Sequence, residues 1–141
     1  MSKLTIGDGS YSCQPEETVL DALLRQEVDV SYACKKGTCH SCILKTIDSS
    51  PSARAQNGLK DTLKNQGYFL ACLCVPEQDM TIKLPEQSEF YTDGKVVANE
   101  MLNRNTILLV LECPDVLEYK AGQFVNIQRA DGVTRSYSIS N

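Results

Sequence analysis

The sequence lacks any long apolar run, and its first residues lack the apolar core of a signal peptide. A helix that crosses a membrane needs roughly 18–20 consecutive apolar residues, and no stretch approaches that length. Residues 3–6 instead alternate polar and apolar side chains, which predicts a half-buried strand at the start of the chain. A phosphate-binding loop of the G-x-G-x-x-G kind is also missing, as are internal repeats and low-complexity segments.

A basic stripe is absent as well. The chain carries 14 basic and 18 acidic side chains, for a formal net charge of −4, and residues 1–90 hold 9 of the basic and 12 of the acidic ones. Without a basic face, a nucleic acid is not an expected partner. A mildly acidic surface suits docking to a basic patch on another protein, and it is equally typical of a solvated surface with no partner.

Cysteine, in contrast, is plentiful, with seven residues among 141. An odd number of cysteines without an export signal argues for a reducing compartment, and we therefore predict a cytoplasmic location. In that setting, cysteines at short spacings favour metal binding over a disulfide framework.

Three of the cysteines, Cys34, Cys39 and Cys42, have the spacing C-x4-C-x2-C, and Cys72 follows after 29 intervening residues. This spacing is typical of a plant-type [2Fe-2S] site, in which one loop supplies three ligands and a distant segment supplies the fourth. Each cysteine would bind iron as its thiolate. A loop is expected around the first three, because the regular period of a helix or strand would not bring three side chains together.

The residues between these cysteines suit such a loop. Gly37 has no Cβ, so it allows a close backbone approach and a positive φ. The hydroxyls of Thr38 and Ser41 and the backbone amides are expected to donate hydrogen bonds to the sulfurs and so tune the potential. His40 is the single histidine, which excludes a Rieske centre with its two histidine ligands, and we expect it to face solvent.

The main alternative is a structural zinc site in a non-enzymatic interaction module. Zinc also accepts four cysteines, but usually as two short-spaced pairs, so the spacing here favours iron and sulfur. The remaining three thiols have simpler interpretations. Cys13 and Cys113 are predicted to be small buried residues on strands, and Cys74 is predicted to pack in the core near the cluster rather than bind it.

The order of elements in residues 1–90 predicts an α+β domain of the β-grasp type, a mixed sheet folded around one helix. We expect a hairpin, then a helix that starts in residues 15–18 and ends near Gln26, then the cysteine loop. Further elements follow from the alternation of apolar residues and from turn signals: a strand at 43–47, a short surface helix within 53–66, an apolar segment at 68–73 and a strand at 80–84.

A polar, turn-rich segment at residues 85–89 predicts the boundary between this domain and a second part, residues 91–141. That part contains four candidate strands separated by turns and no candidate helix, which predicts part of an antiparallel β-barrel or sandwich. The strands are expected at 95–98, 106–113, 123–129 and 134–140.

Residues 1–90 resemble a plant-type [2Fe-2S] ferredoxin domain. The resemblance rests on Tyr32-Ala33-Cys34, on Gly37-Thr38-Cys39, on Cys42 and on Leu70-Ala71-Cys72. It implies a [2Fe-2S] cluster with Cys34, Cys39, Cys42 and Cys72 as ligands. The family usually has glycine after the second cysteine, where this chain has His40, a difference that affects the backbone and removes no ligand.

Residues 91–141 resemble the start of the FAD-binding barrel of ferredoxin–NADP reductase-like proteins. The resemblance rests on Ala121-Gly122-Gln123-Phe124 and on Arg135-Ser136-Tyr137-Ser138, which matches the family's R-x-Y-S motif. It implies that Arg135 pairs with FAD phosphate, that Tyr137 stacks on the isoalloxazine ring and that Ser138 hydrogen-bonds near the ring nitrogen that accepts hydride. A guanidinium suits phosphate and an aromatic face suits a planar ring.

The two parts in this order are similar to the reductases of bacterial oxygenases and to CDP-6-deoxy-glucoseen reductase. Such proteins take hydride from NAD(P)H onto FAD, separate it into single electrons at the cluster and deliver them to an oxygenase or dehydratase component. The sequence ends at Asn141, before the later barrel strands and the nicotinamide domain of that family. We therefore expect this chain alone to bind FAD weakly or not at all and not to oxidise NAD(P)H.

Overall fold

The first hairpin follows from the alternation at the start of the chain. The structure, a computed structural model, describes residues 1–86, 91–113, 120 and 122–139. Strand β1 (Ser2–Ile6) turns at residues 7–8 and pairs antiparallel with β2 (Gly9–Cys13), with Leu4 opposite Tyr11. Leu4 and Cys13 are fully buried, so one face of the hairpin lies on the core.

Helix α1 (Val19–Arg25) covers this sheet with one apolar face. Thr18 caps its N-terminus, because its hydroxyl accepts a hydrogen bond from the Asp21 amide at 3.1 Å. The helix thus begins later than predicted. Glu16 adopts a left-handed φ of 63°, which no helical residue has, so the predicted start in residues 15–18 is wrong.

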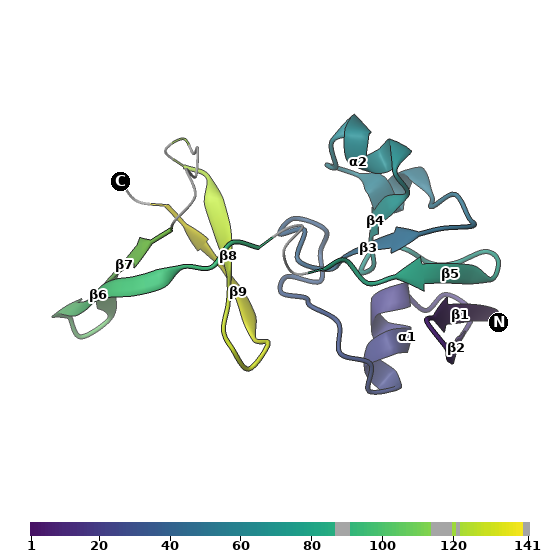
Figure 1. The fold of residues 1–141 in the computed structure, drawn as a ribbon, viewed down its shortest axis with the longest axis horizontal. Coiled ribbons are helices and arrows are strands. Elements are labelled where there is room, and N and C mark those ends of the chain that lie inside the picture. The colour runs from purple at the N-terminus through teal and green to yellow at the C-terminus, as the bar shows by residue number, and fades with distance from the viewer. Residues whose placement is uncertain (87–90, 114–119, 121, 140–141) are drawn as a thin grey trace.

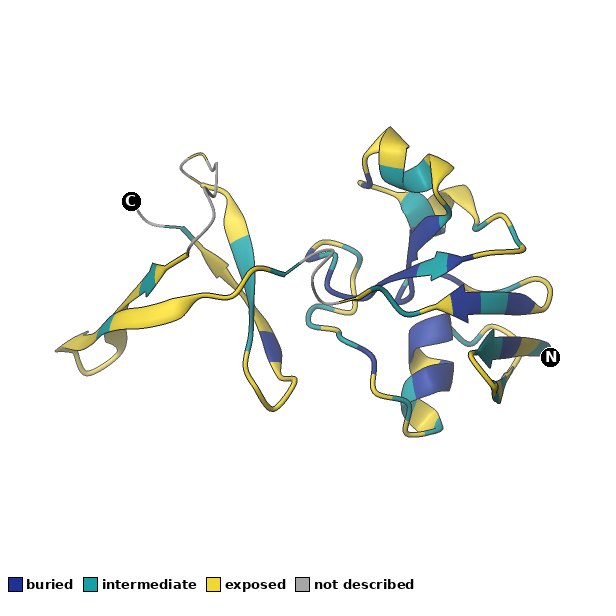
Figure 2. Ribbon diagram, viewed as in Figure 1, coloured by how far each residue is buried: buried dark blue, intermediate teal, exposed yellow. Residues whose placement is uncertain are grey.

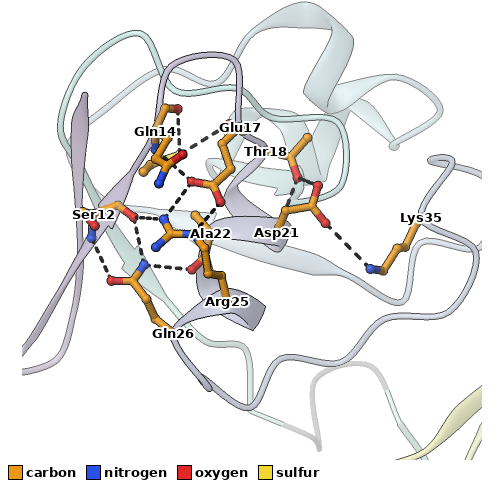
Figure 3. A network of polar contacts seen from close by, with 10 residues as sticks. Ser12, Gln14, Glu17, Thr18, Asp21, Ala22, Arg25, Gln26 and Lys35 are labelled. Atoms are coloured by element: carbon orange, nitrogen blue, oxygen red, sulfur yellow. Dashed lines mark hydrogen bonds and ion pairs between the residues drawn. The ribbon is translucent and has the colours of Figure 1, made fainter.

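A polar network joins α1 to β2 (Figure 3). The Arg25 guanidinium forms an ion pair with Glu17 at 2.9 Å and donates to the Ser12 carbonyl at 3.0 Å. Gln26 also donates to the Ser12 carbonyl, at 2.8 Å. The hydrogen bonds from Arg25 lower the pKa of the Glu17 carboxyl. The side chain of Glu17, which precedes the Thr18 cap, thus links the start of α1 to its last turn.

The sheet of the first part has the strand order β2-β1-β5-β3-β4. Its other members are β3 (Ile43–Thr46), β4 (Tyr68–Leu70) and β5 (Met80–Lys83). Strand β5 pairs parallel with β1 and antiparallel with β3, so the last strand of the domain lies at the centre of the sheet. Between β3 and β4 lie a 3-10 helix, η1 (Ala53–Gln56), and a short helix, α2 (Asp61–Asn65).

The core lies between this sheet and α1. Its largest fully buried side chains include Phe69, Leu4, Leu20, Leu23, Leu44 and Leu70. Figure 2 shows the buried residues concentrated in this half of the molecule. The mixed five-stranded sheet covered by α1 confirms the predicted α+β fold of the β-grasp type. None of the helices in the described part of the chain has the length and apolar character needed to span a membrane.

The second part consists of two antiparallel hairpins (Figure 1). The first pairs β6 (Lys95–Asn103) with β7 (Thr106–Glu112), and the second pairs β8 (Phe124–Gln128) with β9 (Thr134–Ser138). This is a partial barrel, as predicted, although β6 extends five residues beyond the predicted end at residue 98. The predicted boundary at 85–89 falls partly on residues 87–90, which lie outside the described residues.

Many apolar side chains of β6 and β7 remain exposed, because each strand has only the other as a described neighbour. They include Val96, Val97, Met101, Leu102, Ile107 and Leu109. Cys113, directly after β7, is exposed for the same reason, so its predicted burial is wrong. A two-stranded hairpin alone is marginal in water, so this hairpin contributes little to the stability of the chain.

Replacing the cap of α1 is expected to destabilise the first part. Thr18→Ala removes the acceptor for the Asp21 amide, which should lower the free energy of unfolding by about 1 kcal/mol. Chemical unfolding followed by far-ultraviolet circular dichroism measures the loss. Thr62→Ala, at an exposed position within α2, is the matched control and should change stability by only a few tenths of a kcal/mol. Equal stability of the two variants would contradict the capping role.

Candidate metal centre

The cysteine loop connects the end of α1 to β3, and residues 26–42 contain no helix or strand. Cys34, Cys39 and Cys42 lie on this loop, and Cys72 lies two residues after the end of β4. The pairing of β3 with β4 sets Ile43 opposite Leu70. One step further along, the Ala71 amide donates to the Cys42 carbonyl at 3.0 Å. The sheet register thus brings the distant fourth cysteine to the loop.

Cys34 and Cys39 form one pair of thiols. The Cys34 amide donates to the Cys39 sulfur at 3.4 Å, and the Cys39 amide donates to the Cys34 sulfur at 3.4 Å. The chain therefore curls around both sulfurs and aims backbone N–H groups at each of them. Such hydrogen bonds favour the charged thiolate over the neutral thiol.

Further donors surround the same two sulfurs, as the sequence predicted. The Lys36 amide donates to the Cys34 sulfur at 3.2 Å, and the Thr38 hydroxyl donates to it at 3.3 Å. The Ser41 hydroxyl lies 3.2 Å from the Cys39 sulfur. Burial opposes ionisation of the Cys34 thiol, but the hydrogen bonds from Thr38, Lys36 and Cys39 outweigh burial and lower its pKa to about 6.

Cys42 and Cys72 form the second pair, which is more deeply buried. Their side chains are 4% and 8% exposed, and they are hydrogen-bonded to each other. Burial raises the pKa of the Cys42 thiol to about 12, and the neighbouring Cys72 and Cys39 sulfurs add to the rise. The Cys42 sulfur would therefore need a strong positive charge nearby, such as a metal ion, to become a thiolate.

Two pairs of thiols fit a centre with two iron ions better than a site with one ion. A [2Fe-2S] cluster takes four cysteine thiolates, and these four cysteines would be available to hold it. Within the described ranges, no group of three or more histidine, cysteine, aspartate or glutamate side chains gathers around a single ion position.

The loop curls through three left-handed residues, Lys35, Gly37 and His40, with φ of 55°, 80° and 59°. Only glycine adopts this conformation without steric cost. Gly37 also needs its missing Cβ for space, because an added Cβ would lie 2.9 Å from Cγ of Leu73. Leu73 directly follows Cys72, so this close approach holds the loop against the segment that carries the fourth cysteine.

His40 is half-buried, so it faces solvent only in part. Its imidazole lies against Gly58, where an added Cβ would be 3.2 Å from Nε2. The glycine leaves space for the ring, and this packing offsets the left-handed backbone that His40 adopts in place of the family's usual glycine. The sequence holds no local signal for this contact, because the two residues are far apart in the chain.

Cys74 and Cys13 belong to the core, as predicted. Both are buried. Burial is the main cause that raises the pKa of the Cys74 thiol to about 12, and the nearby Cys13 sulfur adds to the rise. The Cys74 carbonyl accepts from the Val19 amide at 2.8 Å, which ties this segment to the start of α1. Lys35 on the loop forms an exposed ion pair with Asp21 of α1 at 3.7 Å.

The three residues expected at FAD lie together on β9 and are exposed. Arg135 is opposite Ile127, Tyr137 is opposite Val125 and Ser138 is opposite Phe124. Since side chains alternate along a strand, Arg135 and Tyr137 share one face of the hairpin and Ser138 lies on the other.

One residue of the same hairpin reaches the cysteine loop, and sequence reasoning missed it. The Asn126 side chain on β8 donates from Nδ2 to the Cys39 carbonyl at 2.6 Å.

Comparison with known protein families agrees with this geometry. Residues 5–77 match the family described as the 2Fe-2S iron-sulfur cluster binding domain. The chain belongs to this family. The match covers the cysteine loop, Cys72 and the start of the polar turn before β5, so the [2Fe-2S] domain includes all four cysteines of the two pairs.

Two similar proteins match this [2Fe-2S] protein over most of its length, beyond the residues of the family match. Reductase component 1 of the terephthalate 1,2-dioxygenase of Comamonas sp is 29% identical over 143 residues, which is 95% of this chain and 42% of the relative. The CDP-6-deoxy-L-threo-D-glycero-4-hexulose-3-dehydrase reductase of Yersinia pestis is 29% identical over 139 residues, 93% of this chain and 42% of the relative. The chain thus spans less than half the length of these curated relatives.

A solved structure shows the same fold along the entire [2Fe-2S] chain. The crystal structure of the Amycolatopsis cytochrome P450 reductase GcoB matches with a TM-score of 0.54 at 24% identity, and it covers 100% of this chain and 45% of that one. A [2Fe-2S] domain followed by part of a β-barrel is therefore the fold of this chain.

Filling the space at Gly37 is expected to prevent normal cluster assembly. Gly37→Ala introduces both left-handed strain of about 1–2 kcal/mol and a clash with Leu73. Gly132→Ala is the matched control, because its φ of 86° brings the same strain but nothing lies within 4 Å. Iron content and visible absorbance should fall for Gly37→Ala and stay normal for Gly132→Ala. Equal iron content in both variants would show that the contact with Leu73 is unimportant.

Removing the Thr38 hydroxyl is expected to make Cys34 harder to ionise. Thr38→Val deletes the 3.3 Å hydrogen bond to the sulfur, so the pKa of the Cys34 thiol should rise from about 6. The pH dependence of Cys34 alkylation in the metal-free protein, followed by mass spectrometry, should shift to higher pH. Ser41→Ala is the control, because this hydroxyl contacts the other sulfur of the pair. An unchanged profile for Thr38→Val would rule out this role of the hydroxyl.

Proposed function

We propose that Cys34, Cys39, Cys42 and Cys72 ligate a [2Fe-2S] cluster and that the chain uses this cluster as a one-electron carrier. The observation that supports this most directly is the arrangement of the four thiols as two pairs, with backbone amides aimed at the sulfurs of the first. When bound, such a cluster takes up and releases a single electron, at about −400 mV in plant-type proteins.

Different residues would hold the two sides of the cluster. The amides of Lys36 and Cys39 and the Thr38 hydroxyl stabilise negative charge on the Cys34 sulfur. The core around Cys42 and Cys72 excludes water from the other side. Lys36 and Thr38 are exposed and Cys34 is only half-buried, so a redox partner would approach the centre from this side of the loop.

We propose further that residues 1–90 form the electron-carrier domain and residues 91–141 the beginning of an FAD-binding barrel. Arg135, Tyr137 and Ser138 would contact FAD phosphate, the isoalloxazine ring and the ring nitrogen, in the roles that the family resemblance implies. Their exposure on β9 leaves them accessible to a ligand. FAD would supply the exchange between two-electron and one-electron chemistry.

The names of the relatives suggest the wider setting. They are reductase components of a dioxygenase and of a dehydrase. We propose that this chain serves in a reductase of the same kind, in which electrons from NAD(P)H reach an oxygenase or dehydratase component through the cluster. A cytoplasmic location is proposed with it, because all seven cysteines are free thiols and ligation requires them to stay reduced.

Replacement of one cysteine of the first pair tests the ligand assignment. Cys39→Ser should abolish the normal cluster, because a serine oxygen replaces a thiolate that two backbone amides and a hydroxyl surround. Iron and sulfide analysis should show the loss, together with the loss of visible bands that bleach on reduction with dithionite. Cys113→Ser is the matched control, since Cys113 is exposed and outside the site, and it should keep wild-type iron content.

Two results would contradict the proposal. One is native colour and iron content in Cys39→Ser, which would remove Cys39 from the ligand set. The other is a colourless wild-type protein that holds one zinc ion per chain, which would favour the structural zinc module.

A further inference from the structure

The hairpin β8–β9 lies beside the cysteine loop in the fold, between the first part of the chain and β6–β7 (Figure 1). Its closest polar contact with the loop is the 2.6 Å hydrogen bond from Asn126 Nδ2 to the Cys39 carbonyl oxygen. The two residues are 87 positions apart in the chain. A strand of the partial barrel thus binds the backbone of a residue whose sulfur belongs to the first thiol pair.

The Asn126 amide is held in one orientation by a neighbour on β9. Asn126 and Ser136 are cross-strand partners, and the Ser136 hydroxyl donates to Asn126 Oδ1 at 2.7 Å. Because Oδ1 accepts from Ser136, the Nδ2 end of the amide is turned toward Cys39. The side chain is therefore preorganised by the hairpin before it meets the loop.

A second contact fixes the other end of the hairpin. The hydroxyl of Thr134, the first residue of β9, lies 3.3 Å from the hydroxyl of Ser31, which precedes Cys34 by three residues. Ser31 also lies 3.3 Å from the Tyr91 hydroxyl. Thr134 is 7% exposed, although the rest of β9 is exposed. The hairpin thus contacts the loop segment on both sides of Cys34.

These contacts come from one face of the hairpin, and two of the three expected FAD residues, Arg135 and Tyr137, lie on the other. Thr134 and Ser136 alternate with Arg135 and Tyr137 along β9, so the two sets point in opposite directions. One face of a single two-stranded sheet therefore holds the cysteine loop, while the opposite face presents a guanidinium and an aromatic ring.

We propose that Asn126 is a positioning residue that docks the β8–β9 hairpin on the cluster loop. The docked hairpin sets the distance from the thiol pair to the face that carries Arg135 and Tyr137. It contacts the loop at Ser31 and at Cys39 and leaves the exposed Lys36 and Thr38 open to a redox partner. The inference rests on the proposed function only in taking the cluster to occupy the four thiols.

Paramagnetic broadening in nuclear magnetic resonance spectra tests the docking directly. The unpaired electrons of a bound [2Fe-2S] cluster broaden signals of nearby nuclei, so amides of β8 and β9 should broaden when iron is loaded, and amides of β6 and β7 should broaden less. In Asn126→Ala and in Asn126→Asp, which has no donor, the broadening of β8 and β9 should decrease. Loss of one hydrogen bond should lower the ratio of docked to undocked hairpin by about fivefold.

Asn99→Ala is the matched control, because Asn99 is an exposed asparagine on β6 and is remote from the loop contact. It should keep the wild-type pattern of broadening. Cross-strand signals between β8 and β9 should persist in every variant, which shows that the hairpin itself is still formed. Wild-type iron-loaded protein without selective broadening of β8 and β9, or equal broadening in wild type and Asn126→Ala, would overturn the proposal.

The metal-free chain separates this inference from the proposed function. Nitrogen-15 relaxation should give a common tumbling time for the first part and for β8–β9 in the wild type, and separate times in Asn126→Ala. Separate tumbling in the wild type would overturn the docking even if the chain binds a cluster. Failure of the chain to take up iron would instead refute the proposed function. The relaxation measurement on the metal-free chain would still show whether β8–β9 docks on the first part.

Discussion

Thiolates can be held close together where hydrogen-bond donors or metal ions offset their negative charge, and the cysteine loop supplies the donors. The amides of Cys34, Lys36 and Cys39 point at sulfurs because the chain turns through left-handed residues between them. Helix or strand backbone could not do this, since its N–H groups are already paired within the element. The loop in turn needs a rigid frame, which α1 on one side and β3 on the other provide. The contact between Gly37 and Leu73 then holds it against the last cysteine.

The hairpin β8–β9 extends this frame beyond the first domain. Its polar contacts with the first part include those of Asn126 and Thr134. Contacts of this kind are weak singly, so the two parts should separate far more easily than the core of the first part unfolds. Such a weak interface would suit the proposed function, in which the first domain docks on β8–β9 while the exposed side of its cysteine loop contacts a redox partner.

The sequence predicted those features that depend on the spacing or alternation of residues close together in the chain. The spacing of Cys34, Cys39 and Cys42 indicated a shared loop, and the alternation of residues 80–84 indicated the strand that became β5. It failed where a distant residue decides the outcome. Glu16 adopts a left-handed φ just before the start of α1, and Gly58 makes room for the His40 ring. The hydrogen bond of Asn126 had no local signal at all, because it depends on how two separately folded parts meet.

The central place of β5 in the sheet has a consequence for the order in which the protein is made. Strands β1 and β3 are neighbours in the sheet only through β5, which is the last of the five to leave the ribosome. Until then the nascent chain has a hairpin at one end and a separate pair of strands at the other, with the core open between them. Pairings between distant segments of this kind form late and slowly. Iron that binds during synthesis would therefore encounter an incompletely folded sheet. We expect the metal centre to assemble only after β5, which ends at Lys83, has been synthesised.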